Sequence, residues 1–305
     1  MRYTLGIDIG GTNIKAGLVH KGNVIKRISF ETKAEDGPDD CIAQIKSIIR
    51  SFNNISNIGI GIAGIIDSKK GIVRYSPNLK GWYNIKLTEP LKEEFKTNVR
   101  ILNDVNAILL GEWIYGAGKG YKNIFLFTLG TGVGGAAVCE GKLLFGANGF
   151  AGEFGHTVIS FNGPECVCGN YGCLERYVGS RYIVELAKKK IAKKRSNLKN
   201  YKDLTPRIIA DEANKGDAVA KDVFEEVGYY IGIGVSNIIN LFDPEVVIIS
   251  GGISRAGKIL FDPIKRTVRE RILGLKYRNL KIVPAKLGDG AGIIGAAHFA
   301  DYKFP

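Results

Sequence analysis

The sequence is poor in several residue types, and these scarcities limit the kinds of protein that it can encode. Its 305 residues include one Met, three His and one Gln. No apolar run approaches the ~18 residues that a membrane span needs. The segment before Gly6 is too short for a signal peptide. We therefore expect a cytoplasmic protein without a membrane partner. Low Met and Gln beside abundant Lys and Glu is typical of thermophile proteins, although an AT-rich genome gives a similar composition.

Cysteine is also scarce: the chain has five, an odd number that cannot all pair in disulfides. Three of them, Cys166, Cys168 and Cys173, fall within eight residues. In a chain without an export signal, such clustering indicates a metal site instead of disulfides.

Acidic residues are fewer than basic ones, and the formal net charge is +13. The basic residues gather in two stretches: Lys188, Lys189, Lys190, Lys193, Lys194, Arg195, Lys199 and Lys202, then Arg266, Arg269, Arg271, Lys276, Arg278 and Lys281. A nucleic-acid surface is one interpretation, but both stretches have the pattern of a helix followed by a loop. A basic patch without a reading module is only an electrostatic feature. We interpret both as solvated faces and expect no nucleic-acid partner.

Glycine is plentiful, and its placement reveals an internal repeat. A strand at 3–8 is followed by the turn 9–13 and a return strand at 14–19. The same pattern recurs about 120 residues later, with a strand at 124–128, a Gly-rich turn at 129–135 and a return at 136–139. Each return precedes a further apolar strand. Two copies of one domain explain such a long period better than a solenoid does.

Helical and strand patterns alternate along the rest of the chain. We predict helices at 40–52, 87–95, 104–115, 180–192, 205–214, 218–240 and 291–300, and strands at 58–62, 99–102 and 246–249. This alternation is typical of an α/β fold. The Gly-rich segment 116–120 is a candidate hinge between a first domain, 1–118, and a second domain, 119–290.

The two turns of the repeat are candidate phosphate-binding loops. In the first, Gly10, Gly11 and Thr12 follow Asp8, which could hold Mg²⁺ through water. In the second, Gly130, Thr131 and Gly132 occupy the matching place. Glycine lets backbone N–H groups converge on an anion without an obstructing Cβ. A lone loop of this kind would be an ordinary hairpin turn, but a matched pair favours phosphate binding. Gly251 and Gly252 end a third strand and permit close approach of a flat ligand, although such a pair is commonly just a turn.

Asn103 and Asp104 lie where a strand passes into a helix. Asp is among the preferred N-cap residues, and the local sequence favours that structural role for Asp104. The functional alternative is a general base that accepts the proton of a hydroxyl attacking the γ-phosphate of ATP.

His156 joins the three clustered cysteines to complete a Cys₃His set. These residues are the ligands of tetrahedral structural zinc, and four protein ligands leave no open position for water. A lone His or Cys would usually belong to the core, but four potential ligands within 18 residues indicate zinc. Glu153 and Glu175 flank the set, so the metal would hold them near each other. Two acceptors fixed in this way could bind adjacent sugar hydroxyls.

The combination of these motifs resembles the ROK family, named for repressors, open reading frames and kinases, and within it the bacterial glucokinases. The resemblance covers essentially the whole chain. It implies two actin-like, ribonuclease H-like domains with a cleft between them, as in hexokinases. It also implies that the C-terminal helix 291–305 joins the first domain and that the second carries a zinc loop at 156–175.

The resemblance further implies ATP-dependent phosphorylation of the 6-hydroxyl of a hexose by a homodimer with Mg²⁺ and structural zinc. It assigns Asp104 as catalytic base, which reverses the local preference for a cap. The implied sugar contacts are Asn78, Asn103, Asp104, Glu153, His156 and Glu175. The implied nucleotide contacts are Asp8, Gly10, Gly11, Thr12, Gly130, Thr131, Gly132, Gly251 and Gly252, and the implied zinc ligands are His156, Cys166, Cys168 and Cys173.

Three alternatives stay open within this family. The hexose could be glucose, N-acetylmannosamine or another sugar, because these kinases share the motifs. Some relatives accept polyphosphate in place of ATP. Repressor members carry a winged-helix segment ahead of the first hairpin, and since this chain begins just before that hairpin, we expect a kinase.

Overall fold

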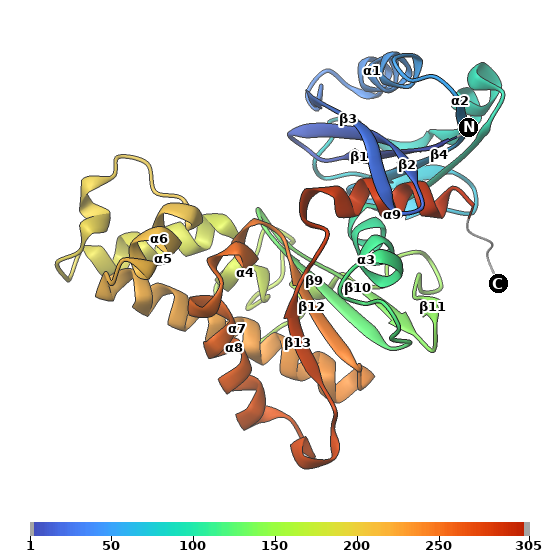
Figure 1. The fold of residues 1–305 in the computed structure, drawn as a ribbon. Helices are drawn as coiled ribbons and strands as arrows, with labels where there is room; N and C mark the ends of the chain where they lie inside the picture. The colour runs from blue at the N-terminus through green and yellow to red at the C-terminus, as the bar shows by residue number, and fades with distance from the viewer. Residues whose placement is uncertain (1–2, 302–305) are drawn as a thin grey trace. The chain divides into compact units, whose positions relative to one another are not determined.

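The computed structural model describes residues 3–301 and divides the chain into two compact units (Figure 1). Unit 1 comprises Met1–Gly120, Leu143–Ala151 and Ala285–Pro305, and unit 2 comprises Tyr121–Lys142 and Gly152–Pro284. This division differs from the predicted domains because unit 1 also takes the segment Leu143–Ala151 and residues 285–290. Of the predicted helix at 291–305, residues 302–305 lie outside the described part.

Unit 1 contains a five-stranded sheet in the order β3-β2-β1-β4-β8. Its strands are β1 (Tyr3–Ile9), β2 (Asn13–His20), β3 (Asn23–Glu31), β4 (Ile55–Ile62) and β8 (Asn98–Asn103). The hairpin β1–β2 is antiparallel, and β4 and β8 run parallel to β1. Ile9, Ile62 and Asn103 are paired neighbours at the carboxyl ends of the parallel strands. The loop after β1 and the helix after β8 therefore start from one edge of the sheet.

One face of this sheet is packed with large apolar side chains. Leu5, Ile7 and Ile9 alternate along β1 and are fully buried, as the two-residue period of a strand requires. They pack in one core with residues of α1 (Pro38–Arg50) and of α2 (Thr88–Phe95). Both helices begin and end within two residues of their predicted bounds.

On the opposite face of the sheet, two glycines lie where α9 (Ala291–Phe299) crosses it. A Cβ at Gly6 would lie 2.0 Å from the carbonyl oxygen of Ile293, and one at Gly59 would lie 1.7 Å from that of Ala296. The helix α3 (Asp104–Tyr115) crosses α9 just as closely, since a Cβ at Gly295 would lie 1.7 Å from the carbonyl oxygen of Ala107. Glycine at these positions lets the helix backbone rest directly on its neighbours.

A small antiparallel sheet completes unit 1 and was not predicted from the sequence. It consists of β5 (Ile65–Asp67), β6 (Ile72–Tyr75) and β7 (Tyr83–Lys86). These strands have three or four residues each, too few for their alternation to stand out from a loop.

Unit 2 repeats the sheet of unit 1, as the sequence repeat predicted. Its strand order is β11-β10-β9-β12-β13, with an antiparallel hairpin β9–β10 and the parallel strands β12 and β13 beside β9. The strands are β9 (Ile124–Leu129), β10 (Val133–Cys139), β11 (Lys142–Leu143), β12 (Val246–Ser250) and β13 (Lys281–Pro284). The strand that follows β10, β11, has only two residues, fewer than expected. Ser250 pairs with Thr128, so the loops after β9 and β12 start from one edge.

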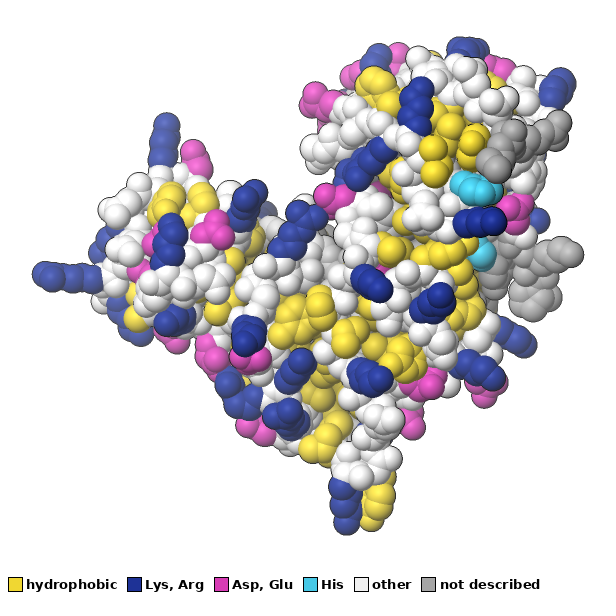
Figure 2. Space-filling model, viewed as in Figure 1, with side chains coloured by type: hydrophobic (Ala, Val, Ile, Leu, Met, Phe, Trp, Pro, Cys, Tyr) yellow, Lys and Arg dark blue, Asp and Glu magenta, His cyan; other side chains and the backbone are white. Residues whose placement is uncertain are grey.

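The helices of unit 2 are α4 (Glu175–Val178), α5 (Ser180–Ile191), α6 (Pro206–Asn214), α7 (Ala218–Phe242) and α8 (Lys258–Arg271). Of these, α5, α6 and α7 match predicted helices, whereas α4 was not predicted and α8 was expected only as the helical part of the second basic stretch. Several basic residues of the two predicted stretches pair with carboxylates: Lys190 with Asp222 and Glu226, Lys194 with Asp222, Arg266 with Glu225, and Arg278 with Asp243. On the face seen in Figure 2, Lys and Arg side chains are dispersed instead of forming one patch. Within residues 3–301, no helix has both the length and the apolar character needed to cross a bilayer.

Candidate functional site

The first candidate phosphate loop is a tight turn closed by its own backbone. The N–H of Gly10 donates to the carbonyl of Asn13 at 3.0 Å. The carbonyl of Gly10 accepts from the hydroxyl of Thr32 at 2.8 Å. A Cβ at Gly11 would lie 3.1 Å from the Cβ of Asn78. The fold therefore brings Asn78 beside this loop, although 66 positions separate Asn78 from Thr12.

Asp8 lies on the glycine-lined face of the sheet, two residues from Gly6. A Cβ at Gly292, in the first turn of α9, would lie 2.7 Å from its carboxylate oxygen Oδ2. Burial raises the pKa of Asp8, and the nearby Lys15 and Arg27 counteract this only in part. Burying a charged carboxylate destabilises a fold, so keeping Asp8 here points to a role outside folding.

Asn103, and not Asp104, caps helix α3. Its side-chain oxygen accepts from the N–H groups of Val105 and Asn106 at 2.9 and 3.1 Å. Its amide nitrogen donates to the carbonyl of Gly64 at 3.1 Å. Asp104 is the first residue of the helix. The local interpretation of Asp104 as the cap is therefore wrong, since the residue before it performs that task.

In unit 2, Glu175 binds the end of the second glycine loop. Its oxygen Oε2 accepts from the N–H of Val133 at 2.9 Å, and a Cβ at Gly132 would lie 2.4 Å from the same atom. The other side of the loop is held by Ser180, whose N–H and hydroxyl both donate to the carbonyl of Gly130. This loop is therefore fixed by both α4 and α5.

The segment that carries Glu153 and His156 packs against the same strand, β10. A Cβ at Gly152 would lie 2.2 Å from the carbonyl oxygen of Gly135, and one at Gly155 would lie 2.1 Å from that of Val133. These two glycines therefore let the segment lie close to the β10 backbone. The fold gathers Glu153, His156 and Glu175 around the start of this strand.

His156 and the three clustered cysteines form a compact group. One potential ligand atom from each residue lies within 4.8 Å of all the others. The sulfur of Cys166 is 3.8 Å from Nδ1 of His156, and the sulfurs of Cys168 and Cys173 are 3.7 Å apart. Zinc–sulfur bonds of about 2.3 Å in a tetrahedron place ligand atoms about 3.8 Å apart. The four residues therefore fit a zinc ion, with Nε2 as the remaining ring nitrogen of His156.

A cavity of about 510 Å³ in unit 2 adjoins both the second glycine loop and the turn after β12. Its lining includes Gly130 and Gly252, two of the nucleotide contacts expected from the sequence. Gly251, at a φ of 91°, has no room for a Cβ because the carbonyl oxygen of Leu129 would lie 2.2 Å from it. Sequence reasoning missed the remaining walls, which come from Ser180, from α6 with the residue before it, and from the turn after Gly252; they include Thr205, Arg207, Asn214, Ile253 and Arg255. The Thr-Pro at 205–206 marks a helix start but gives no sign of a pocket.

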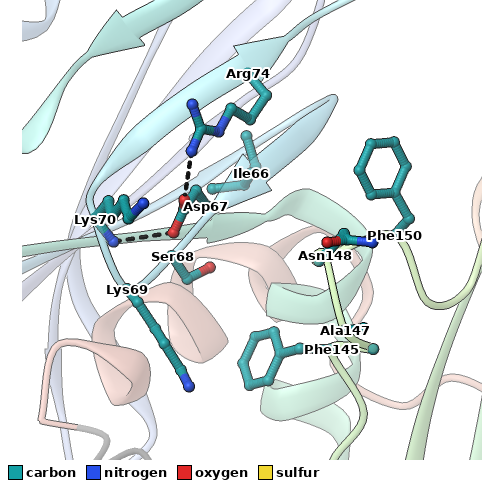
Figure 3. A pocket seen from close by; sticks show the side chains of 12 residues that line it. Ile66, Asp67, Ser68, Lys69, Lys70, Arg74, Phe145, Ala147, Asn148 and Phe150 are labelled. Carbon is teal, nitrogen blue, oxygen red and sulfur yellow. Dashed lines mark hydrogen bonds and ion pairs between the residues drawn. The ribbon is translucent and has the colours of Figure 1, made fainter.

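A larger cavity, of about 750 Å³, lies in unit 1 between the β5–β6 hairpin and the segment 145–150. Figure 3 shows Asp67 on the hairpin side, where it accepts hydrogen bonds from Arg74 and from the N–H of Lys70, and Phe145, Asn148 and Phe150 on the other side. Its lining contains none of the residues that the sequence predicted for a site. Volume alone is therefore a poor guide to the chemistry of this chain.

We predict that Asp8→Asn raises the melting temperature at pH 8. Because burial raises the pKa of Asp8 in the folded chain, its neutral form favours folding and its ionised form opposes it. That stabilisation is complete below the ordinary pKa of 3.8 and is lost as the pH rises through the raised value. The gain from Asn should therefore vanish near pH 4. Thermal unfolding at both pH values tests this, with Asp36→Asn at an exposed site as control; a destabilised Asp8→Asn at pH 8 would contradict it.

Comparisons with known proteins agree with this architecture. The family model described as the ROK family matches residues 4–303. A glucokinase of Thermotoga maritima is 38% identical over 302 residues, covering 96% of this chain and 95% of that protein. A xylose repressor of Caldicellulosiruptor bescii is 35% identical over 307 residues, covering 95% of this chain and 76% of the repressor.

A solved structure extends these matches to three dimensions. It is a ROK family glucokinase from Streptomyces griseus in complex with glucose and AMPPNP, with a TM-score of 0.85 and 32% identity, covering 98% of this chain and 99% of that one. With its paired sheets, glycine loops and Cys₃His group, the chain belongs to the ROK family.

Proposed function

We propose that this protein is an ATP-dependent hexose kinase that transfers the γ-phosphoryl group to the 6-hydroxyl of glucose. The observation that carries the proposal is the position of Asp104, which begins a helix at the same sheet edge as the Asp8 loop but does not cap it. The glucokinases of Thermotoga maritima and Streptomyces griseus, both similar over nearly the whole chain, support glucose as the acceptor.

In unit 1, Asp104 is the proposed general base. It would accept the proton of the 6-hydroxyl as that oxygen attacks phosphorus. The side-chain oxygen of Asn103 is committed to the helix cap, and one amide hydrogen to Gly64. Its second amide hydrogen would donate to a sugar hydroxyl. Asn78, beside the first glycine loop, is the third proposed sugar contact.

In unit 2, the proposed sugar contacts are Glu153, His156 and Glu175. Glu175 uses one oxygen for Val133 and would accept a sugar hydroxyl with the other. His156 directs Nδ1 at the cysteines and would offer Nε2 to the sugar. Glu175 would thereby link sugar binding to the phosphate loop, because the same carboxylate fixes the N–H of the residue after Gly132.

The proposed nucleotide site uses the two glycine loops for phosphates and the unit 2 cavity, with Gly251 and Gly252, for adenosine. The N–H groups of Gly10 and Gly130 donate within their own turns. Those of the next two residues in each loop would donate to phosphate oxygens. Asp8 is the proposed partner of Mg²⁺, which neutralises charge on the transferred phosphoryl group. Zinc on His156, Cys166, Cys168 and Cys173 would be structural, since it would hold the sugar-binding segments together.

The proposal is tested by kcat/KM for glucose, mannose, N-acetylmannosamine, N-acetylglucosamine and fructose with ATP. We expect glucose to be the best acceptor and ATP hydrolysis without sugar to stay near background. A sugar lacking the hydroxyls that meet Glu153 and Glu175 leaves carboxylates unpaired and should react slowly. A tenfold lead of N-acetylmannosamine, about 1.4 kcal/mol, would leave a kinase but remove the glucose assignment.

The similarity to a xylose repressor raises a second candidate, a sugar-responsive regulator. Such a protein would bind its sugar without releasing ADP. A coupled ADP-release assay beside a DNA shift assay separates the two functions. Sugar-dependent ADP release at ordinary kinase rates, about 1–100 per second, excludes a purely regulatory role.

We predict that Asp104→Asn folds normally but turns over about 10²–10⁴ times more slowly, as loss of a general base usually causes. Asn103→Ala is the matched contrast, because it removes the cap and should cost about 1 kcal/mol of unfolding free energy. Melting temperatures and kcat of both variants test the division of roles. An unstable Asp104→Asn with normal kcat in its folded fraction would return Asp104 to a structural role.

We predict about one zinc ion per purified chain, as one Cys₃His set binds. Cys168→Ser should release the metal, lower the melting temperature and raise KM for the sugar, because the loop bearing Glu153 and Glu175 loses its anchor. Cys139→Ser, in β10 outside the cluster, is the control and should change none of these. Metal analysis, thermal unfolding and kinetics are the measurements; full activity in metal-free protein contradicts the prediction.

A further inference from the structure

Glu112 is a fully buried carboxylate that the proposed phosphoryl transfer does not use. It lies near the end of α3, and its exposed fraction is 0%. Glu is almost never completely buried unless it is paired, because an unpaired buried charge is strongly destabilising. The partners of Glu112 therefore indicate what the fold gains from it.

Those partners are backbone N–H groups from two segments far apart in the sequence. Oε2 accepts from Ala117 at 2.8 Å and from Lys286 at 3.0 Å. Oε1 accepts from Lys286 at 2.9 Å and from Leu287 at 2.6 Å. A Cβ at Gly116 would lie 2.1 Å from Oε2, so the chain can turn around the carboxylate only with glycine there.

The main chain of Glu112 strengthens the same attachment. Its carbonyl accepts from the N–H of Gly116 at 3.0 Å and from that of Gly118 at 2.8 Å. One residue thus accepts hydrogen bonds from five backbone N–H groups through its carboxylate and carbonyl together. The segment 116–118 wraps around Glu112. The segment 286–287, which is distant in the sequence, donates its N–H groups to the same carboxylate.

Both segments are linkers next to unit boundaries. The chain passes between the units at four points, of which the first follows Gly120 and the last precedes Ala285. Ala117 therefore belongs to the outgoing linker, and Lys286 and Leu287 to the returning one. The helix that holds both linkers begins with Asp104, the proposed base.

We propose that Glu112 is a positioning residue that anchors these two linkers to α3 and so limits where the chain bends at the first and last crossings when sugar binds. The inference rests on the proposed function. Hinge motions are absorbed by a few loop residues, and a sugar favours the state with which it makes more contacts. With these two linkers anchored, bending at the first and last crossings is confined to a few residues. Freed linkers would sample more conformations, and sugar binding would have to order them.

Glu112→Gln is the most direct test because it keeps the shape of the side chain. Its amide nitrogen cannot accept, so at least one linker N–H loses its partner. We expect KM for glucose to rise about tenfold, a coupling of ordinary size between binding and conformational change. Glu112→Asp, one methylene shorter, should give a smaller rise.

Glu212→Gln is the matched control. Glu212 is also buried, at 4% exposed, but it binds the hydroxyl of Tyr201 and the ammonium of Lys215 within unit 2. Its replacement should lower the melting temperature while KM for glucose stays unchanged. If Glu112→Gln does not fold, Leu287→Pro removes one donor from the other side of the contact; Leu287 has a φ of −82°, near the value that proline requires.

Amide hydrogen exchange without substrate provides a readout that does not depend on kinase activity. In Glu112→Gln, the amides of Ala117, Lys286 and Leu287 should exchange faster than in the parent or in Glu212→Gln. Faster exchange with a raised KM supports the proposal. Unchanged exchange overturns it, and so does faster exchange with unchanged kinetic constants. A parent protein that lacks kinase activity refutes the proposed function instead, and the change in radius of gyration on adding glucose then replaces KM as the readout.

Discussion

The direct contact between the backbone of α9 and the sheet is the constraint on which the arrangement of unit 1 depends. Gly6 and Gly59 remove the side chains that would otherwise separate them. The first turn of α9 thereby reaches Asp8 on the same sheet face, and α3 crosses α9 at Gly295. The close packing of α9 thus determines both the position of Asp8 and the position of the helix that starts at Asp104. A larger residue at any of these glycines would displace the helices and with them both carboxylates.

Asp8 and Glu112 show two solutions to the cost of burying a carboxylate. The carboxylate of Glu112 accepts hydrogen bonds from backbone N–H groups of both linkers, and these bonds replace the water that it loses on burial. Asp8 has Lys15 and Arg27 only as partial compensation, and its pKa is raised. The first arrangement stabilises the fold, whereas the second resembles a binding site that is complete only with a cation. A buried carboxylate therefore has a different meaning at each of these two positions.

The sequence was a good guide wherever a pattern was long or chemically distinctive. The repeated hairpins, helix α3 and the Cys₃His group follow directly from spacing and residue type, and the fold confirms each arrangement. Asn78 was named only through the family resemblance, since nothing local connects it to Gly11. The cap was misassigned because Asn and Asp are both good caps and only backbone geometry distinguishes them. The linker contacts of Glu112 and the short strands β5–β7 depend on tertiary packing, which local patterns do not encode.

The last helix of the chain completes the first unit, and this has a consequence for synthesis on the ribosome. Until residues 291–299 emerge, the glycine face of the first sheet has nothing to pack against, and Asn98 lacks the carbonyl of Ala300 to which its side chain donates at 2.7 Å. Unit 2 takes most of its residues from one continuous stretch, Gly152–Pro284. We therefore expect the usual order, in which the N-terminal domain folds first, to be reversed here. A nascent chain that stalls near its end would expose an unfinished first unit beside a finished second one.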